Sequence, residues 1–507
     1  MKKNLIYIIL TFLLTFYSKA QTSQDAFNLS TSGIFGSARY TSMGGAFGSL
    51  GGDLSSISDN PAGAAVFLYP EMGISFEVNF NNSISNGDNR NLPVKGSFSD
   101  LNQFGLIFSL KNTKDESFKF KRLNFGFNIQ KVQEFKNNIN SISSRNIGID
   151  QFFLNNAQGV PLDDLMTREN ETISELYDFL GNNYGYSTQQ AFLGFNGYII
   201  DPVSNEENNI NYVSAAKYNK LNHDFYLDRT GDHKKYTFTI ATQYENSFYL
   251  GLNLNSHQVY YHEISDLYES NYSLDSNIDL IQFNNDVLTQ GSGFSAQLGI
   301  IAKIKNNFRL GFSYQSPTRL NLTEESMQFI ITDHLNFPQE NLIQDVVDPQ
   351  ILNISKYKLS TPSKTSISGS FIIGSKGLIS AEFSSKNYGN INFITRQNAY
   401  LRSLNQELSS NYRKASMVKL GGEMRTEEIV LRAGYYSEQS SLKNGDNSHS
   451  GITFGIGYDF KNGSILSLAI KNSYMNLINS LSTSGINDNF SANRKQTSVM
   501  TSYNFKL

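Results

Sequence analysis

Residues 72 to 80 read MGISFEVNF, and every second residue of this stretch is apolar: Met72, Ile74, Phe76, Val78 and Phe80. The residues between them are glycine or polar. This period of two places the apolar side chains on one face of a β-strand. The same pattern recurs in RLNFGFNI (122–129), FYLGLNLN (248–255) and FRLGFSY (308–314). The sequence therefore predicts a chain built mainly of strands.

The composition narrows the class of protein. The chain of 507 residues has 37 Phe, 28 Tyr and 38 Gly but no Cys, which excludes disulfides, thiolate metal sites and a cysteine nucleophile. With 42 basic and 45 acidic residues, the charge gives no argument for nucleic acid as a partner. A large soluble β-sandwich and an outer-membrane β-barrel both remain compatible with alternating strands.

The first residues predict export. MKKN is a basic start, residues 5–17 form an apolar run, and Ser18-Lys19-Ala20 ends it with small residues at the two positions that a signal peptidase reads. We expect a signal peptide over 1–20, with Gln21 as the first mature residue. No later apolar run is long enough for a transmembrane helix.

The connections between strands favour the barrel. Short turns near 244–247, 305–307, 374–377, 425–428 and 461–463 alternate with long polar segments, the longest over 136–233. Short turns at one rim and long loops at the other are typical of outer-membrane barrels, whereas a soluble sandwich does not require this alternation. The pattern predicts an all-β, fourteen-stranded antiparallel transmembrane barrel over 70–507, with 136–233 as a long extracellular insertion. The predicted strands are 70–80, 101–111, 121–134, 235–244, 247–262, 292–304, 307–318, 363–373, 377–388, 415–424, 428–437, 450–460, 463–474 and 496–507.

Residues 21–69 precede the first strand and show no strand pattern. Because the lumen of such a barrel is too wide for its own side chains to fill, we expect this segment to be a glycine-rich plug, or hatch. Its end reads Asn60-Pro61-Ala62-Gly63. Asn60 can cap a short helical turn and Pro61 suits its first position, although an ordinary linker turn would use the same residues.

These residues carry a family resemblance. Ala38-Arg39, Met43-Gly44-Gly45-Ala46, Asp53 and Asn60-Pro61-Ala62-Gly63 resemble the hatch signature of the FadL family of outer-membrane transporters for long-chain fatty acids and other hydrophobic compounds. The segments 308–322, 360–371 and 418–440 also resemble strand–turn–strand units of that family. The resemblance spans nearly the whole mature chain. It implies a hatch-closed barrel in the bacterial outer membrane, an apolar pocket and sideways release of the substrate.

The resemblance also directs the choice of site residues. The hatch offers five pocket candidates: Phe27, Leu29, Ile34, Phe35 and Phe47, which could equally be packing core. In the third strand the apolar parity fails at Gln130, Lys131, Val132 and Gln133, where a bulge would form a lateral gate. A strand that simply leaves the hydrocarbon zone would show the same change of parity.

The segment 136–233 contains two expected helices. Thr172 and Glu175 form a possible capping box for the first, which Gly181 can end, and Ser187 to Gln190 can start the second. Their apolar residues are candidates for an outer capture groove: Ile173, Leu176, Tyr177, Leu180 and Phe192. Packing of the helices on each other and on the barrel rim would explain these residues as well.

We therefore expect a passive channel for hydrophobic small molecules among the lipids of the outer membrane. The six histidines show no metal-ligand spacing and no nucleophile elbow is present, so we expect no enzyme, metal or cofactor. A second hypothesis remains open. A FadL-like barrel can also serve as a surface adaptor in protein secretion, with exported proteins as its partners.

Overall fold

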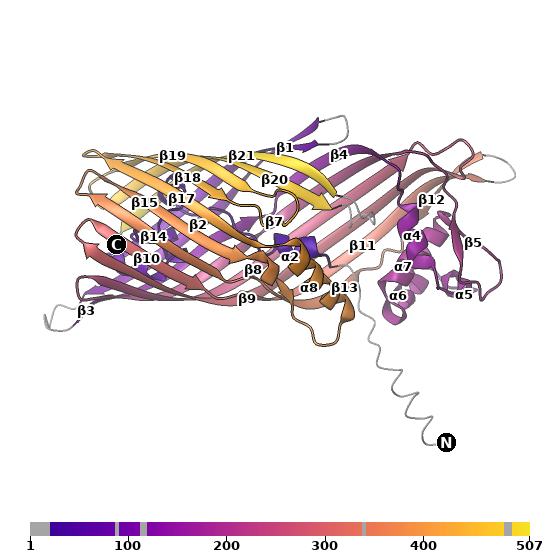
Figure 1. The fold of residues 1–507 in the computed structure, drawn as a ribbon, viewed down its shortest axis with the longest axis horizontal. Helices are drawn as coiled ribbons and strands as arrows, with labels where there is room; N and C mark the ends of the chain where they lie inside the picture. Colours follow the sequence, from indigo (N-terminus) through magenta and orange to yellow (C-terminus); the bar gives the residue numbers. More distant parts are fainter. Residues whose placement is uncertain (1–20, 87–90, 112–118, 337–340, 481–488) are drawn as a thin grey trace, which may run out of the picture.

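The computed structural model describes residues 21–86, 91–111, 119–336, 341–480 and 489–507 (Figure 1). The predicted signal peptide 1–20 lies outside the described residues. One antiparallel sheet closes on itself as a fourteen-stranded barrel. It closes because β1 (Glu71–Asn86) pairs with β2 (Asn91–Lys111) on one side and with the last strand, β21 (Asn489–Lys506), on the other.

The other strands follow one another around the wall in chain order, and several consist of two pieces that continue each other. They are β3 (Phe120–Glu134) with β4 (Asn137–Arg145), β7 (Leu221–Tyr244), β8 (Phe248–Ser270), β9 (Ile278–Lys305), β10 (Phe308–Gln315) with β11 (Arg319–Asn336), β14 (Lys364–Ile373) with β13 (Asn353–Ser360), β15 (Gly377–Asn387), β17 (Lys414–Arg425), β18 (Ile429–Glu438), β19 (His449–Asp459) and β20 (Ser464–Ser480).

Each strand predicted from the alternation falls on one strand of this wall. Many strands, however, run further toward the long loops than predicted. β4 and the first part of β7 pair with each other inside the predicted insertion 136–233, which leaves residues 146–220 as the inserted segment. The apolar alternation cannot reveal these extensions, because backbone pairing continues above the lipid while the outward side chains become polar.

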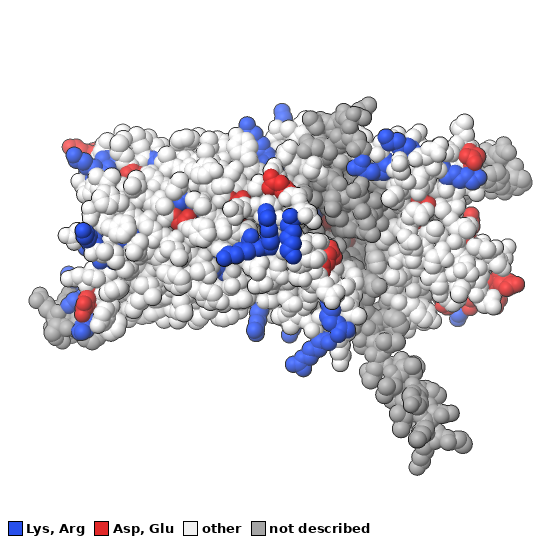
Figure 2. Space-filling view, viewed as in Figure 1, with Lys and Arg blue, Asp and Glu red and all other residues white. Residues whose placement is uncertain are grey.

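The wall has its apolar side outside. Phe76, Val78 and Phe80 are 54%, 40% and 51% exposed, whereas Ser75, Glu77 and Asn79 between them are fully buried. Figure 2 shows a wall with few charged side chains between two more highly charged ends. A soluble sandwich would bury its apolar face, so this arrangement identifies the outer surface as a lipid-facing one.

The hatch fills the lumen. Its elements are α2 (Ser23–Asn28), α3 (Ala38–Ser42) and the 3₁₀ helices η1 (Leu54–Ser58) and η2 (Pro61–Val66). Leu54, Ile57 and Phe67 pack against wall residues Ile107 and Tyr249. Thr22 caps α2 through a capping box with Asp25, which explains why so short a helix forms. The hatch is therefore a packed body inside the barrel, as predicted.

The segment 146–220 forms a small layer of helices at the long-loop end (Figure 1). It contains α4 (Asp150–Ala157), α5 (Leu162–Leu165), α6 (Ile173–Asn183), α7 (Tyr186–Asn196) and the β5–β6 pair (Ile200–Pro202, Tyr212–Ser214). The remaining elements at this end are β12 (Asn341–Val347), η3 (Tyr388–Asn390), β16 (Asn392–Phe393) and α8 (Ala399–Asn411). None of the helices in the described residues is long and apolar enough to cross a membrane.

A substitution at Gly251 of β8 would test how closely the hatch packs against the wall. A Cβ at Gly251 would lie 2.3 Å from the carbonyl carbon of Pro61, so the Gly251→Ala substitution must push η2 away from β8. Overpacking of this kind costs about 1–3 kcal/mol. We expect faster protease cleavage within the hatch while the folded barrel still runs as a compact band in unheated gels.

Gly369→Ala is the matched control, because a Cβ there has no neighbour closer than 3.8 Å. Equal cleavage rates in the two variants would contradict a tight contact between hatch and wall.

Candidate functional site

The Asn60-Pro61-Ala62-Gly63 turn ties the hatch to the wall. The Asn60 side chain accepts a hydrogen bond from the N–H of Ala62 at 3.0 Å and so caps η2, with Pro61 in its first turn. Its amide nitrogen donates to the carbonyl of Gly48 at 2.6 Å and, at longer distances, to Ile300 and Phe312 in the wall. The cap predicted from the sequence is present, and the same side chain also joins hatch and barrel.

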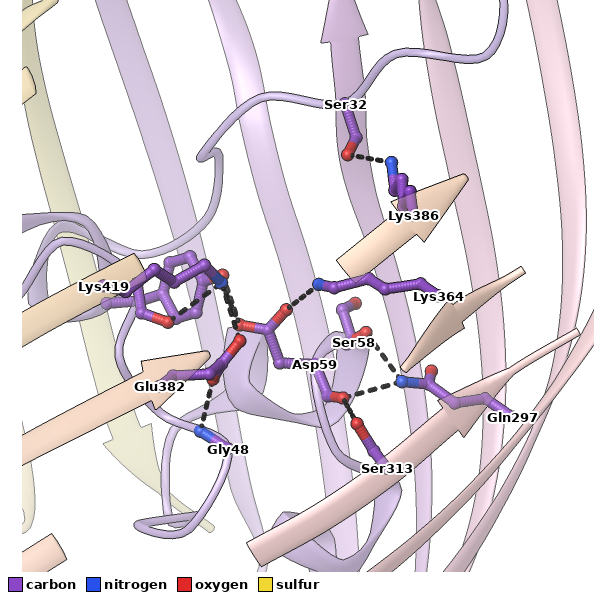
Figure 3. A network of polar contacts seen from close by, with 12 residues as sticks. Ser32, Gly48, Ser58, Asp59, Gln297, Ser313, Lys364, Glu382, Lys386 and Lys419 are labelled. Atoms are coloured by element: carbon purple, nitrogen blue, oxygen red, sulfur yellow. Dashed lines mark hydrogen bonds and ion pairs between the residues drawn. The ribbon is translucent and has the colours of Figure 1, made fainter. Parts of the chain in front are cut away.

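Asp59, directly before this turn, lies at the centre of a buried charge network (Figure 3). Its carboxylate is 3.1 Å from the Nζ of Lys364 and 3.1 Å from the Nζ of Lys419, and it accepts a hydrogen bond from the Tyr40 hydroxyl at 2.5 Å. Lys419 also pairs with Glu382 at 3.1 Å. Glu382 in turn accepts a hydrogen bond from the N–H of Gly48 at 3.0 Å. Hatch and wall are thus held together by charges that neither could bury alone.

The backbone and the protonation state of Asp59 fit this role. The Asp59 carbonyl accepts hydrogen bonds from Gln297 and Ser313, both at 2.7 Å. Burial alone would raise the pKa of the Asp59 carboxyl, but Lys364 and Lys419 outweigh it and hold that pKa well below its ordinary value. Asp59 is therefore ionised wherever the network is intact.

A second charge cluster anchors the hatch further along. Glu423 of β17 pairs with Arg39 at 2.9 Å and with Arg432 of β18 at 2.8 Å. Arg39 also donates to the carbonyl of Gly52 at 2.8 Å. Both clusters place charged residues on inward-facing strand positions. None of these wall residues was among the site candidates predicted from the sequence. A charge at a lumen-facing position of a predicted strand was the available signal.

A cavity of about 130 Å³ lies beside the first part of the hatch. Phe27, Ile34 and Phe35, three of the five pocket candidates, line it. Leu29 and Phe35 line a neighbouring cavity of about 90 Å³. Phe47 lines neither; it is fully buried and packs with Ile34 and Tyr40, so it belongs to the hatch core.

The walls of these cavities are more charged than an apolar pocket would be. Lys235 and Lys386 both border the smaller cavity, with His233 and His257 nearby. Lys386 is 2.6 Å from the Ser32 hydroxyl, and Lys235 is 3.4 Å from the carbonyl of Ser58. Within the described residues neither ammonium group has a carboxylate at ion-pair distance. The lumen thus places the buried Lys235 and the half-buried Lys386 beside the rings of Phe35 and Tyr40.

The third strand of the wall is irregular at the four positions singled out as gate candidates. Lys131 pairs with Lys234 and Gln133 pairs with His233, so Val132 is an extra residue that bulges out of the β3–β7 ladder. On the other side, the pairing of β3 with β2 ends at Gln130. Beyond that point β2 pairs with β1 alone and β4 pairs with β7 alone.

The chain bends into the lumen at this break. The carbonyl of Lys136 accepts hydrogen bonds from Asn81 in β1 and from Arg494 in β21, which lie two and three strands away around the wall. The hatch supplies part of the missing pairing. Val132 accepts a hydrogen bond from the N–H of Gly33 at 2.9 Å, and the Gln130 side chain donates to the carbonyl of Phe35. The hatch therefore occupies the place of a missing strand partner.

The outer capture candidates lie in the packed core of the inserted segment. Leu176, Tyr177, Leu180 and Phe192 are buried, and Ile173 is half-buried against the same core. The predicted capping box of Thr172 and Glu175 is present. Gly181 does not end its helix, since α6 continues to Asn183. The second helix begins at Tyr186 without a side-chain cap. These residues belong to the packed core of the inserted segment.

Comparison with solved structures shows which known proteins share this fold. The sequence matches no protein-family model and no curated protein. Among solved structures, a Pseudomonas aeruginosa FadL homologue is similar over 94% of this chain and 99% of its own, with a TM-score of 0.54 and 13% identity. This chain has the FadL fold.

A second solved structure with the FadL fold is the Pseudomonas putida toluene transporter TodX. It matches 94% of this chain and 100% of its own, with a TM-score of 0.50 and 12% identity. With its closed barrel and apolar outer wall, the chain is an outer-membrane β-barrel of the bacterial type.

Asp59→Asn tests the buried network. The substitution removes the charge that Lys364 and Lys419 share, and breaking a buried ion pair in this way costs about 3 kcal/mol. We expect amide exchange in η1 and η2 to accelerate on the order of a hundredfold. Because the folded pKa of Asp59 lies below its ordinary value, the wild-type protection should persist down to about pH 4 and be lost only in stronger acid.

Asp275→Asn is the control, since Asp275 makes only an exposed ion pair with Lys217. If amide exchange in η1 and η2 were equally fast in the Asp59 variant and in this control, the network would not hold the hatch to the wall.

Proposed function

We propose that this protein is a passive outer-membrane channel for hydrophobic compounds, and that its preferred substrates carry an anionic head group, as long-chain fatty acids do. The observation that carries the proposal is that two lysines, the buried Lys235 and the half-buried Lys386, border a cavity with an aromatic wall and have no carboxylate at ion-pair distance within the described residues. The FadL fold supports the channel function in general, and the charges of this lumen support the choice of substrate.

The apolar part of a substrate finds aromatic and aliphatic surface in the larger cavity. Its lining includes Phe27, Phe35 and Phe135 at one side and Met475 and Leu477 at another. The Phe135 and Tyr261 rings lie edge to face with centroids 5.0 Å apart, which gives a fixed wall. The cavity is small in this state, so a long chain requires the hatch segment beside it to shift.

The charges of the two cavity lysines indicate the chemistry of the substrate's head group. Burying an ammonium group without a partner costs several kcal/mol, and a carboxylate placed between Lys235 and Lys386 would remove much of that cost. A neutral aromatic hydrocarbon gives no such compensation. The charge distribution therefore favours an anionic amphiphile over a compound such as toluene.

The release route follows from the break in the wall. Exposing an acyl chain to water costs about 0.8 kcal/mol per methylene, so a sideways exit into the bilayer is preferable to a watery pore. The gap between β2 and β4 above Gln130 is the place where the wall lacks strand pairing in the described residues. We assign the lateral gate to Gln130, Lys131, Val132 and Gln133, with hatch residues 33–35 as its moving part.

Removing the two lysines tests the substrate class. In cells lacking their own transporter, we expect the wild-type protein to give saturable uptake of labelled oleate. Lys235→Met with Lys386→Met should reduce it about tenfold at low concentration, because the head group loses both cations. Uptake of toluene should stay within twofold.

Lys376→Met with Lys461→Met is the matched control, because both lysines are exposed in turns at the opposite rim. An equal loss for oleate and toluene would refute recognition of the head group. Absence of any uptake by a folded wild-type barrel would contradict the proposed substrate and would favour another cargo or the secretion-adaptor hypothesis.

Deleting Val132 tests the gate. The deletion restores an even register between β3 and β7 and should straighten the strand past the gap, so oleate uptake should fall at least fivefold while the barrel still folds. Lys121 is the control, because it is the extra residue of a second irregularity in the same ladder, near the other rim. Similar losses from both deletions would argue against a gate at Val132.

A further inference from the structure

Three cations share an outward-facing patch where β11 and β13 leave the apolar belt. Lys358 lies opposite Asn321 and Lys356 lies opposite Thr323 in the pairing of the two strands, and Arg319 stands two residues before Asn321. All three cations are exposed, whereas Leu320, Leu322 and Leu359 between them point inward and are buried. Cross-strand diagonal neighbours are about 7–8 Å apart, so the three charges can converge on one group.

The acidic side chains of the described residues do not balance the three charges of the patch. None of the three cations has a carboxylate at ion-pair distance. Glu324 is buried and points inward, whereas Glu325, opposite Ile354 at the upper edge of the patch, is a diagonal neighbour of Lys356 and can offset only one of the three charges. Like charges at such spacing repel each other, and the repulsion grows near a low-dielectric bilayer. The arrangement is costly unless an anion from outside the chain joins it.

The position of the patch identifies the source of that anion. Directly below Arg319, the outward residues Phe312 and Tyr314 of β10 belong to the lipid-facing belt, and Phe294 of β9 stands opposite Arg319. The patch lies at the end of the barrel that carries the long loops, which faces the outer leaflet.

The surrounding polar groups suit a phosphate. Asn321 and Thr323 stand opposite the two lysines, and Ser292 and Gln290 stand opposite them on β9. Ile394 donates its N–H to the carbonyl of Lys358 at 2.8 Å, and the exposed cation Arg396 follows two residues later. We propose that Arg319, Lys356 and Lys358 bind the phosphate of a lipid head group in the outer leaflet. The site is separate from the channel through the lumen.

The test uses the full-length barrel in detergent and native mass spectrometry. The probes are lipid A with two phosphates, lipid A with one phosphate, and inorganic phosphate. We expect the Arg319→Gln, Lys356→Gln, Lys358→Gln variant to bind two-phosphate lipid A on the order of tenfold more weakly than the wild type. Lys358→Gln alone should cost about threefold, which keeps the test valid if the triple variant folds poorly.

Lys305→Gln, Lys376→Gln and Lys461→Gln remove the same charge from exposed positions at the opposite rim and should change binding less than twofold. The wild type should also prefer two phosphates to one. Equal losses in both triple variants would mean general attraction between charges and would overturn the site. Displacement of lipid A by an equal concentration of inorganic phosphate would overturn the lipid as its ligand.

Discussion

Closure of the sheet is the constraint on which the rest of this structure depends. In a bilayer every backbone N–H and C=O must find a partner within the protein, and a closed barrel achieves this by leaving no free edge. Closure with fourteen strands fixes a lumen too wide for wall side chains alone. The polar inner faces then need partners as well, and the hatch supplies them. Asp59, Asn60 and Arg39 are bonded to wall residues for this reason.

The break between β2 and β3 is an exception to closure that the structure compensates locally. Past Gln130 the backbone loses its neighbour on one side, and the hatch replaces it through Gly33 and the carbonyl of Phe35. A hatch segment can leave such a position more easily than a wall strand can, because it is held there by few hydrogen bonds. In the proposed lateral gate, this hatch segment would be the element that moves.

The fold was predictable because its dominant signal is local. Alternation in stretches such as 72–80 follows directly from lipid on one side and a polar lumen on the other, and the cap of η2 could be inferred from Asn60 and Pro61 alone. The strand extensions were not predictable, nor was which of the five pocket candidates would be packing core, as Phe47 is, since both depend on tertiary contacts. The Asp59 network joins residues more than 300 positions apart, from Asp59 to Lys364 and Lys419, and no spacing in one sequence indicates which charges will meet.

The same few hatch residues connect the charged cavity with the break in the wall. Ser32 bonds to Lys386, Gly33 bonds to Val132, and Phe35 accepts a hydrogen bond from Gln130. An anion that takes the place of Ser32 at Lys386 would remove one of the contacts that hold this segment beside β3. The energy released at the head group would then weaken the cover of the gap. The proposed channel would need no other source of energy to couple recognition with release, because both would depend on one short segment of backbone.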